Sequence, residues 1–194
     1  MWGDIMRVIG GEAKRCRLAT LKGKDLRPTS ERVKEALFNI LANRVPGSRF
    51  LDLFAGTGGI GIEALSRGAE SAVFVERDPR AVKLIRENLE RTGLSNRAQV
   101  YGRDVLSLLP YLARKKERFD LVYIDPPYQR GYEKKVLRLL AELDLLEAEG
   151  LVVVESSARE LPPDKVHRLV LKRRERYGDT ALSFYALEEE KVCE

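Results

Sequence analysis

The sequence predicts a Rossmann-like α/β fold with a mostly parallel sheet, and three observations lead to that prediction. Short apolar runs alternate with longer segments whose apolar residues recur at helical spacing, as expected for strands and the helices that cover them. A glycine-rich turn joins the first strand of this series to the helix after it. Two closing strands, near 166–173 and 180–187, leave little room for a helix between them, which predicts an antiparallel hairpin at the end of the sheet.

The elements can be placed in order along the chain. Residues 7–20 predict a short β-ribbon, and a helix is then expected to begin at Pro28 and Thr29 and to end at Pro46-Gly47. The apolar face of that helix consists of Val33, Leu37, Ile40 and Leu41. Strands are expected at 50–54, 72–76, 98–101, 120–124 and 150–155, and helices at 59–67, 79–92, 104–114 and 132–146. This order predicts a sheet that is covered by helices on both faces.

A glycine-rich loop follows the strand 50–54. Gly56, Gly58 and Gly61 match the dinucleotide pattern G-x-G-x-x-G, and Glu76 ends the next strand. Two cofactors fit this pattern: a nicotinamide dinucleotide held through its pyrophosphate, or S-adenosylmethionine, whose methionine part would approach the glycine backbone. Asp52 favours S-adenosylmethionine, because its carboxylate could orient an ammonium group, directly or through water, but would repel a pyrophosphate. Glu76 suits the ribose diol of either cofactor.

A third strand end adds two candidate contacts to the cofactor. Asp104 could accept from an adenine amine while the Val105 N–H addresses a ring nitrogen, although an Asp that opens a helix is often only its N-cap. The candidate cofactor-binding residues are Asp52, Phe54, Gly56, Gly58, Gly61, Glu76, Arg77, Asp104 and Val105.

The tetrapeptide Asp125-Pro126-Pro127-Tyr128 directly follows a buried strand and is the candidate catalytic segment. Its residue types suit methylation of an exocyclic amine on a nucleobase. The Asp125 carboxylate and the Pro126 carbonyl could accept the two N–H hydrogens of the amine, and consecutive prolines stiffen the loop that holds these acceptors. Tyr128 offers a ring on which a base can stack, worth roughly 1–3 kcal/mol. A tight proline-rich turn without catalytic function is the alternative interpretation.

The positive charge of the chain is concentrated at its N-terminal end. Residues 1–49 contain eleven Lys and Arg against five Asp and Glu, whereas residues 50–194 contain twenty-four against twenty-five. We therefore expect residues 1–46 to form a basic extension that contacts RNA phosphates, and residues 47–190 to form the cofactor-binding domain. The candidate RNA contacts are Arg7, Lys14, Arg15, Arg17, Lys22, Arg27, Thr29, Arg32 and Tyr128, and Lys24 and Lys34 add to the same excess. The clusters 114–116 and 172–174 are interpreted as ordinary solvated faces.

Several segments together resemble the RsmD-type bacterial 16S rRNA guanine-N2 methyltransferases. These segments are 6–11, 27–29, 32–39, 51–69, 125–128 and 177–182. The resemblance implies a class I S-adenosylmethionine-dependent methyltransferase fold, with a seven-stranded, mostly parallel sheet that ends in an antiparallel hairpin. It implies methyl transfer to N2 of guanine 966 of 16S rRNA, on the small ribosomal subunit or one of its assembly intermediates.

Three alternative functions are considered. Enzymes that methylate adenine N6 or cytosine N4 use a similar tetrapeptide, but they generally carry a sizeable target-recognition domain, and residues 1–46 are few for that role. A nicotinamide oxidoreductase would need a substrate domain. A non-catalytic RNA-binding module would not need both Asp52 and Asp125, so measuring cofactor binding distinguishes it from an enzyme.

Length and composition indicate one ordinary domain. At 194 residues the chain is long enough for one hydrophobic core. No apolar run approaches the roughly 20 residues of a membrane helix, and no signal-peptide pattern is present. Cys16, Cys193 and the single His167 cannot form a metal site with the usual number of ligands. We therefore expect a monomeric cytoplasmic protein with reduced thiols and no metal.

Overall fold

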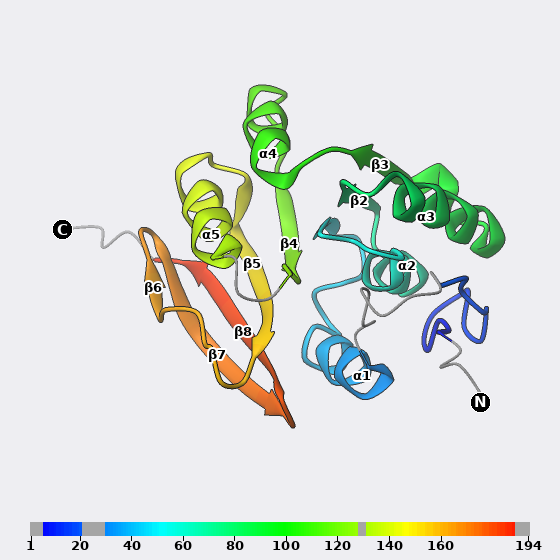
Figure 1. Cartoon of the computed structure of the whole chain (residues 1–194), viewed down its shortest axis with the longest axis horizontal. Coiled ribbons are helices and arrows are strands. Elements are labelled where there is room, and N and C mark those ends of the chain that lie inside the picture. Colours follow the sequence, from blue (N-terminus) through cyan, green and yellow to red (C-terminus); the bar gives the residue numbers. More distant parts are fainter. Residues whose placement is uncertain (1–5, 21–29, 128–130, 189–194) are drawn as a thin grey trace.

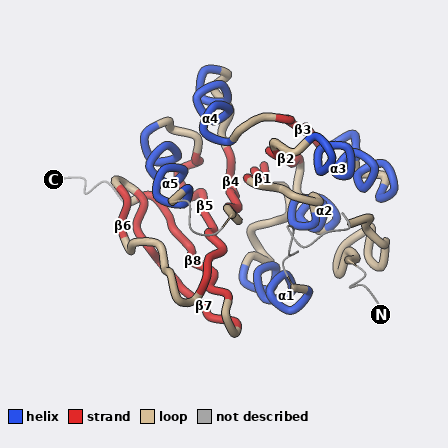
Figure 2. The backbone as a smooth tube through the Cα atoms, viewed as in Figure 1, coloured by secondary structure: helices blue, strands red, loops and turns tan. Residues whose placement is uncertain are grey.

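A computed structural model of the chain describes residues 6–20, 30–127 and 131–188. The expected α/β class is confirmed: Figures 1 and 2 show one sheet with helices on both of its faces. In chain order the elements are α1 (Glu31–Ile40), β1 (Arg49–Leu53), α2 (Gly59–Ser66), β2 (Ser71–Glu76), α3 (Pro79–Thr92), the 3-10 turn η1 (Ser95–Arg97), β3 (Ala98–Gly102), α4 (Val105–Arg114), β4 (Phe119–Ile124), α5 (Tyr132–Glu142), β5 (Leu146–Ser157), β6 (Lys165–Val166), β7 (Leu169–Tyr177) and β8 (Thr180–Leu187).

The sheet has the strand order β3-β2-β1-β4-β5-β8-β7-β6. The pairs from β3 to β5 are parallel, and β8, β7 and β6 add antiparallel pairs, which confirms the closing hairpin. The sheet within the described residues has eight strands, one more than expected, because the two-residue strand β6 pairs with the edge of β7. Connections leave the middle of the sheet in opposite directions at β1 and β4, so a ligand site is expected beyond the carboxyl ends of these two strands.

Several expected boundaries differ from the structure. The first helix, α1, ends at Ile40 with Leu41 as its C-cap, and not at Pro46-Gly47 as expected. β7 spans Leu169–Tyr177 and not 166–173. α5 ends at Glu142, earlier than expected, because Asp144 has a left-handed backbone (φ 53°) that stops the helix, and β5 then begins at Leu146. The β-ribbon expected at 7–20 is reduced to one antiparallel bridge between Arg7 and Arg17. The expected helix start at Pro28 and Thr29 lies outside the described residues.

Ser30 caps α1, because its hydroxyl accepts from the Val33 N–H at 3.3 Å. Val33, Leu37 and Leu41 are buried as expected. Ile40, the remaining member of the expected apolar face, is half-buried and packs against the same core. Phe38 is fully buried in this core but was not part of the face that helical spacing predicted.

Each face of the sheet has its own apolar core. Residues 6–20, α1, α2 and α3 pack on one face, where Phe50, Phe74 and Tyr123 point. Helices α4 and α5 cover the other face, where Leu53 and Ile124 point. Figure 1 shows α4 and α5 on one side of β4, and α1 and α2 on the other. Within the described residues, none of these helices has both the length and the apolar composition that crossing a membrane requires.

A buried ion pair attaches the N-terminal segment, residues 6–20, to α2. The Glu63 carboxylate is fully buried and accepts from the backbone N–H groups of Ile9 at 2.9 Å and Gly10 at 2.7 Å. It also pairs with Lys34 at 3.2 Å and with Arg67 at 2.8 Å. Lys34 is only 2% exposed, so the expectation that it adds to the RNA-binding positive surface is wrong. Its ammonium group instead forms an ion pair with Glu63 inside the protein.

A second attachment connects the N-terminal segment to the glycine loop. Asn88 on α3 is fully buried; its amide exchanges hydrogen bonds with the backbone of Ala19 and also donates to the Thr57 carbonyl at 3.0 Å. The sulfur of Met6 accepts a contact at 3.5 Å from the Thr57 hydroxyl. The N-terminal segment is therefore packed directly against the loop that the sequence assigns to the cofactor.

Candidate functional site

The carboxylate of Glu76 holds the glycine loop in place. Glu76 ends β2, and its two oxygens accept from the backbone N–H groups of Gly56 at 3.0 Å and Asp78 at 2.8 Å. Each carboxylate oxygen has a second lone pair, and Glu76 is only half-buried, so it can also accept from a ribose hydroxyl. Glu76 thus lies where the sequence places the ribose ligand and has the capacity for that role.

Asp52 lies beneath the glycine loop. Its side chain is only 2% exposed, and its Oδ2 accepts from the Gly61 N–H at 2.9 Å. Burial raises the pKa of Asp52 to about 7, against the lowering effect of the Gly61 N–H. Such burial favours an indirect role, in which Asp52 shapes the loop and contacts an ammonium group through water or its second oxygen.

Two of the glycines are required by the fold of the loop itself. Gly58 has φ 80°, in the left-handed region, and precedes α2 without a capping side chain. In the first turn of α2 the Gly61 N–H already donates to Asp52. A Cβ on Gly61 would overlap the Phe74 ring and lie 3.1 Å from the Asp52 carboxylate. We expected the glycines to admit a ligand, but the constraint on Gly61 comes from close packing between α2 and the sheet.

Asp104 is the N-cap of α4, the alternative considered for it. Its Oδ1 accepts from the Leu106 N–H at 2.9 Å. Capping uses one carboxylate oxygen, so the role of Asp104 and Val105 as contacts to adenine stays a prediction. Arg77, another candidate, is exposed in the turn after β2.

The candidate catalytic segment begins where β4 ends, next to the end of β1. Leu53 pairs with Ile124, so Asp125 follows β4 beside the residue that opens the glycine loop. Burial, followed by the negative charges of Glu155 and Asp52, raises the pKa of Asp125 well above the ordinary value. Pro126 is buried and Pro127 is exposed, while Tyr128 lies outside the described residues.

Sequence reasoning missed two residues beside Asp125. Ile124 pairs with Val154, so Glu155 follows on the neighbouring strand, on the same face of the sheet as Asp125. Glu155 is 5% exposed and accepts from the Tyr123 hydroxyl. A buried polar pair at a strand end is a signal of function, but the sequence showed only a tyrosine in an apolar run and a glutamate after another.

An aromatic contact connects the two candidate loops. Phe54 has φ 64°, rare for a bulky residue, and this turns its ring towards the face covered by α5. There it meets Tyr132 at the start of α5, with ring centroids 5.6 Å apart and an edge-to-face geometry. Strained backbone of this kind gathers at functional sites. Phe54, a candidate cofactor contact, therefore also joins the glycine loop to the segment after Asp125.

The strand ends concentrate negative charge. Glu76 ends β2 and Asp125 follows β4, while Asp52 and Glu155 lie inside β1 and β5 close to the carboxyl ends of these strands. The pKa values of Asp52 and Asp125 are raised partly by these neighbours. A cationic ligand such as a sulfonium and its ammonium group would be attracted to this edge, whereas a pyrophosphate would be repelled. The residues therefore fit S-adenosylmethionine. Within the described ranges, no group of acidic, His or Cys side chains is arranged to hold a metal ion.

The candidate RNA contacts divide into three groups. Lys14, Arg15 and Arg17 in the N-terminal segment and Arg32 on α1 are exposed, and no carboxylate pairs with them in the part of the chain that the structure describes. Arg7 is exposed but paired with Glu31 at 3.0 Å, so its charge is partly compensated. Lys22, Arg27 and Thr29 lie outside the described residues.

Comparisons with known proteins show which family the chain resembles. A family model described as "Conserved hypothetical protein 95" matches residues 6–186. The chain is 41% identical to the "Putative rRNA methyltransferase YlbH" of Bacillus subtilis, over 93% of this chain and 98% of that protein. It is 34% identical to the "Ribosomal RNA small subunit methyltransferase D" of Escherichia coli, over 94% of this chain and 90% of that protein. Among solved structures, a putative methyltransferase from Escherichia coli superimposes with a TM-score of 0.84 at 32% identity, covering 95% of this chain and 99% of the other.

Proposed function

We propose a specific reaction for this chain, starting from its family. The chain belongs to the Conserved hypothetical protein 95 family, whose members are rRNA methyltransferases that use S-adenosylmethionine. The acceptor is the N2 amine of guanine 966 in 16S rRNA, within the small ribosomal subunit or an assembly intermediate. Family membership sets aside the nicotinamide oxidoreductase. The acceptor base, the particle, the division at residue 46, the monomeric state and the cytoplasmic location stay predictions.

The single observation that carries the proposal is the position of Asp125 and Pro126 beside the start of the glycine loop. S-adenosylmethionine supplies an electrophilic methyl group bound to a sulfonium. The Asp125 carboxylate and the Pro126 carbonyl accept the two N–H hydrogens of the amine and direct its lone pair towards that methyl group. As the N–C bond forms and the S–C bond breaks, the amine becomes acidic and releases a proton. Positioning, worth up to about 7–11 kcal/mol, therefore outweighs strong base catalysis.

The product identifies the acceptor base directly. The test is to incubate 16S rRNA and small-subunit particles with labelled S-adenosylmethionine and to analyse the nucleosides by mass spectrometry. N2-methylguanosine supports the proposal. N6-methyladenosine or N4-methylcytidine would replace the proposed acceptor, and cofactor binding without any product would favour the non-catalytic RNA-binding module.

Glu76→Ala is expected to weaken S-adenosylmethionine binding by roughly 1–3 kcal/mol, because ribose hydroxyls and two loop N–H groups lose their acceptor. Titration calorimetry with S-adenosylmethionine or S-adenosylhomocysteine measures the change. Glu70→Ala is the matched control, since it removes an exposed carboxylate at the opposite end of β2. Equal affinities of the two variants would refute the assignment of Glu76.

Neutralising Lys14, Arg15 and Arg17 is expected to weaken rRNA binding and to flatten its dependence on salt by about one unit per lost phosphate contact. The apparent KM for RNA should rise, while cofactor affinity stays unchanged. Filter binding at several ionic strengths gives the slope. An unaltered slope and unaltered RNA kinetics would mean that the segment is only a solvated cover on the sheet.

A further inference from the structure

A cluster of cations and tyrosines lies on α4 and the end of β3. The guanidinium of Arg103 lies 5.4 Å from the centroid of the Tyr111 ring, and the ammonium of Lys115 lies 5.8 Å from the same centroid. Tyr101 on β3 meets the Tyr111 ring edge-on at 6.3 Å. We call Tyr101, Arg103, Tyr111 and Lys115 the Tyr111 cluster. Of these residues only Lys115 belongs to the segment 114–116 that was interpreted as an ordinary solvated face, and it shares the Tyr111 ring with Arg103.

The charge of the Tyr111 cluster is uncompensated. Within the described residues two other rings contact a cation, Phe119 with Arg49 and Phe38 with Arg67, and both of those arginines are ion-paired with glutamates. No ion pair engages Arg103 or Lys115 in the described part of the chain. The surrounding exposed side chains add Arg114 and Lys116 to the positive charge.

The acidic side chains near the Tyr111 cluster already have partners. Glu117 is near enough to affect Tyr101, and it is paired with Arg49. Asp104, directly after Arg103, caps α4. The cluster therefore presents a net positive surface, because the acidic neighbours are engaged elsewhere and the contact of Arg103 is with an uncharged ring.

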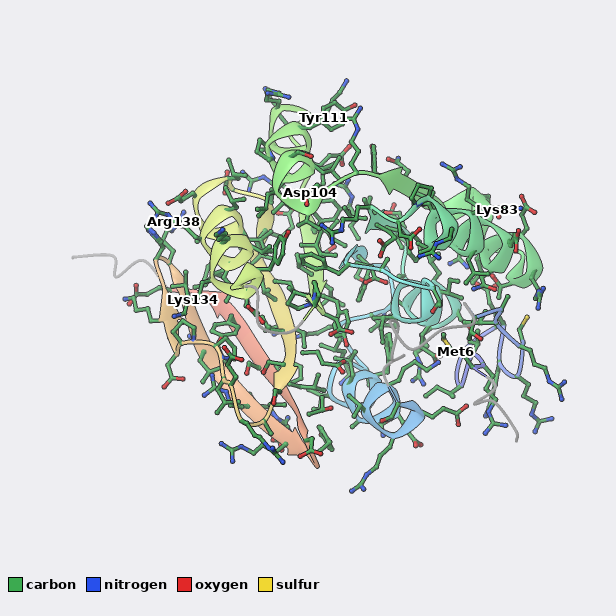
Figure 3. All side chains as sticks on the ribbon, in the orientation of Figure 1. Met6, Lys83, Asp104, Tyr111, Lys134 and Arg138 are labelled. Carbon is green, nitrogen blue, oxygen red and sulfur yellow. The ribbon has the colours of Figure 1, made fainter. Side chains whose placement is uncertain are left out.

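The Tyr111 cluster and the N-terminal segment lie on opposite faces of the sheet. The N-terminal segment packs in the core shared by α1, α2 and α3, whereas α4 covers the other core. Figure 3 shows Asp104 and Tyr111 along α4 and Met6 well apart from them. Arg103 also directly precedes Asp104, at the edge where the strands end. A ligand reaching both positive surfaces must therefore extend from one face of the sheet to the other.

We propose that the Tyr111 cluster is a second phosphate-binding surface for the rRNA substrate, which grips a segment of backbone distant from the target base. This inference rests on the proposed function. An ordered guanidinium edge suits bidentate binding of a phosphate, and a neighbouring ammonium suits a second phosphate of the same strand. A long folded RNA can contact this surface and the N-terminal segment together, whereas a short stem-loop bound at the target base reaches only one of them.

The test compares Arg103→Ala/Lys115→Ala with a control of equal charge loss, Lys83→Ala/Arg86→Ala on α3. Both control residues are exposed, and Figure 3 shows Lys83 far from Tyr111. For the cluster variant, binding to full-length 16S rRNA should weaken by about fivefold or more at moderate salt, with a salt slope smaller by about two units. Methylation of a short stem-loop that contains guanine 966 should stay within about twofold of wild type, as should the affinity for S-adenosylhomocysteine.

The outcomes separate this inference from the proposed function. A wild-type enzyme that methylates 16S rRNA, together with a cluster variant indistinguishable from the control, overturns the second surface alone. Equal losses on full-length RNA and on the stem-loop also overturn it, because the cluster would then act at the target base. A wild type without activity on rRNA would overturn the proposed function instead. Lys115→Glu, which leaves Arg103 on its ring, repeats the comparison if the double variant is poorly folded.

Discussion

Asp125→Ala should lower kcat for methyl transfer by about a thousandfold, while S-adenosylmethionine affinity changes only a few-fold. Asp125 lies beyond β4 beside the start of the glycine loop, and we propose that it accepts from the amine there. Its loss removes an acceptor that orients the lone pair, an interaction made mainly as the new bond forms. Single-turnover kinetics with labelled cofactor measure the chemical step, and calorimetry measures the affinity.

The matched control removes a carboxylate that lies near the catalytic segment in the chain but outside it. Glu133→Ala alters the first turn of α5, shortly after the catalytic segment, and should retain near-normal turnover. Near-normal turnover in Asp125→Ala would contradict the catalytic assignment. A large loss of cofactor affinity in that variant would instead place Asp125 among the cofactor ligands.

The pH dependence follows from the raised pKa of Asp125. Burial contributes most to the shift, and the charges of Glu155 and Asp52 add to it. A protonated carboxyl offers fewer acceptors, so kcat/KM should rise as the pH increases through this raised pKa. In Asp125→Asn this rise of kcat/KM with pH should be absent. Glu155→Gln removes one neighbouring negative charge, so the rise should occur at lower pH than in the wild type. A rise at the same pH would show that Glu155 does not raise the pKa of Asp125.

The sequence predicted those parts of the site that depend on local pattern. Glu76 and Asp125 stand at the ends of apolar runs and Asp52 lies near the end of another, and in a parallel sheet such ends meet at one edge whatever the loops do. The strand and helix order of the central fold followed from periodicity in the same way. The early end of α5 was missed because Asp144 adopts a left-handed backbone that no apolar pattern signals.

Features that depend on distant partners were not predictable from local pattern. Lys34 looks like one more basic residue of the N-terminal region, and only its approach to Glu63 shows that its charge is internal. Glu155 and Tyr123 meet across two strands. A polar side chain on an amphipathic segment is normally exposed, so its burial becomes evident only when the partner that compensates its charge is located.

Glu63→Gln is expected to lower the free energy of unfolding by about 3–5 kcal/mol, as when one partner of a buried ion pair is removed. Lys34 is 2% exposed, and its ammonium also donates to the Arg7 carbonyl at 2.6 Å. The ammonium could reach solvent only by breaking this hydrogen bond and leaving the core. Burial lowers the pKa of Lys34, and the charge of Glu63 opposes that effect. Without Glu63 the ammonium is buried and uncompensated. Urea denaturation followed by circular dichroism measures the change.

Two further variants show whether the buried pair itself is responsible. Glu12→Gln removes a carboxylate that pairs with Arg97 at the surface, and should cost less than about 1 kcal/mol. The double variant Glu63→Gln/Lys34→Met removes both buried charges and should be more stable than Glu63→Gln alone. The loss of unfolding free energy in the double variant could instead equal the sum of the losses in Glu63→Gln and Lys34→Met. That result would contradict a direct interaction between the two side chains. In that case the loss would come from the N–H groups of Ile9 and Gly10, which depend on the same carboxylate.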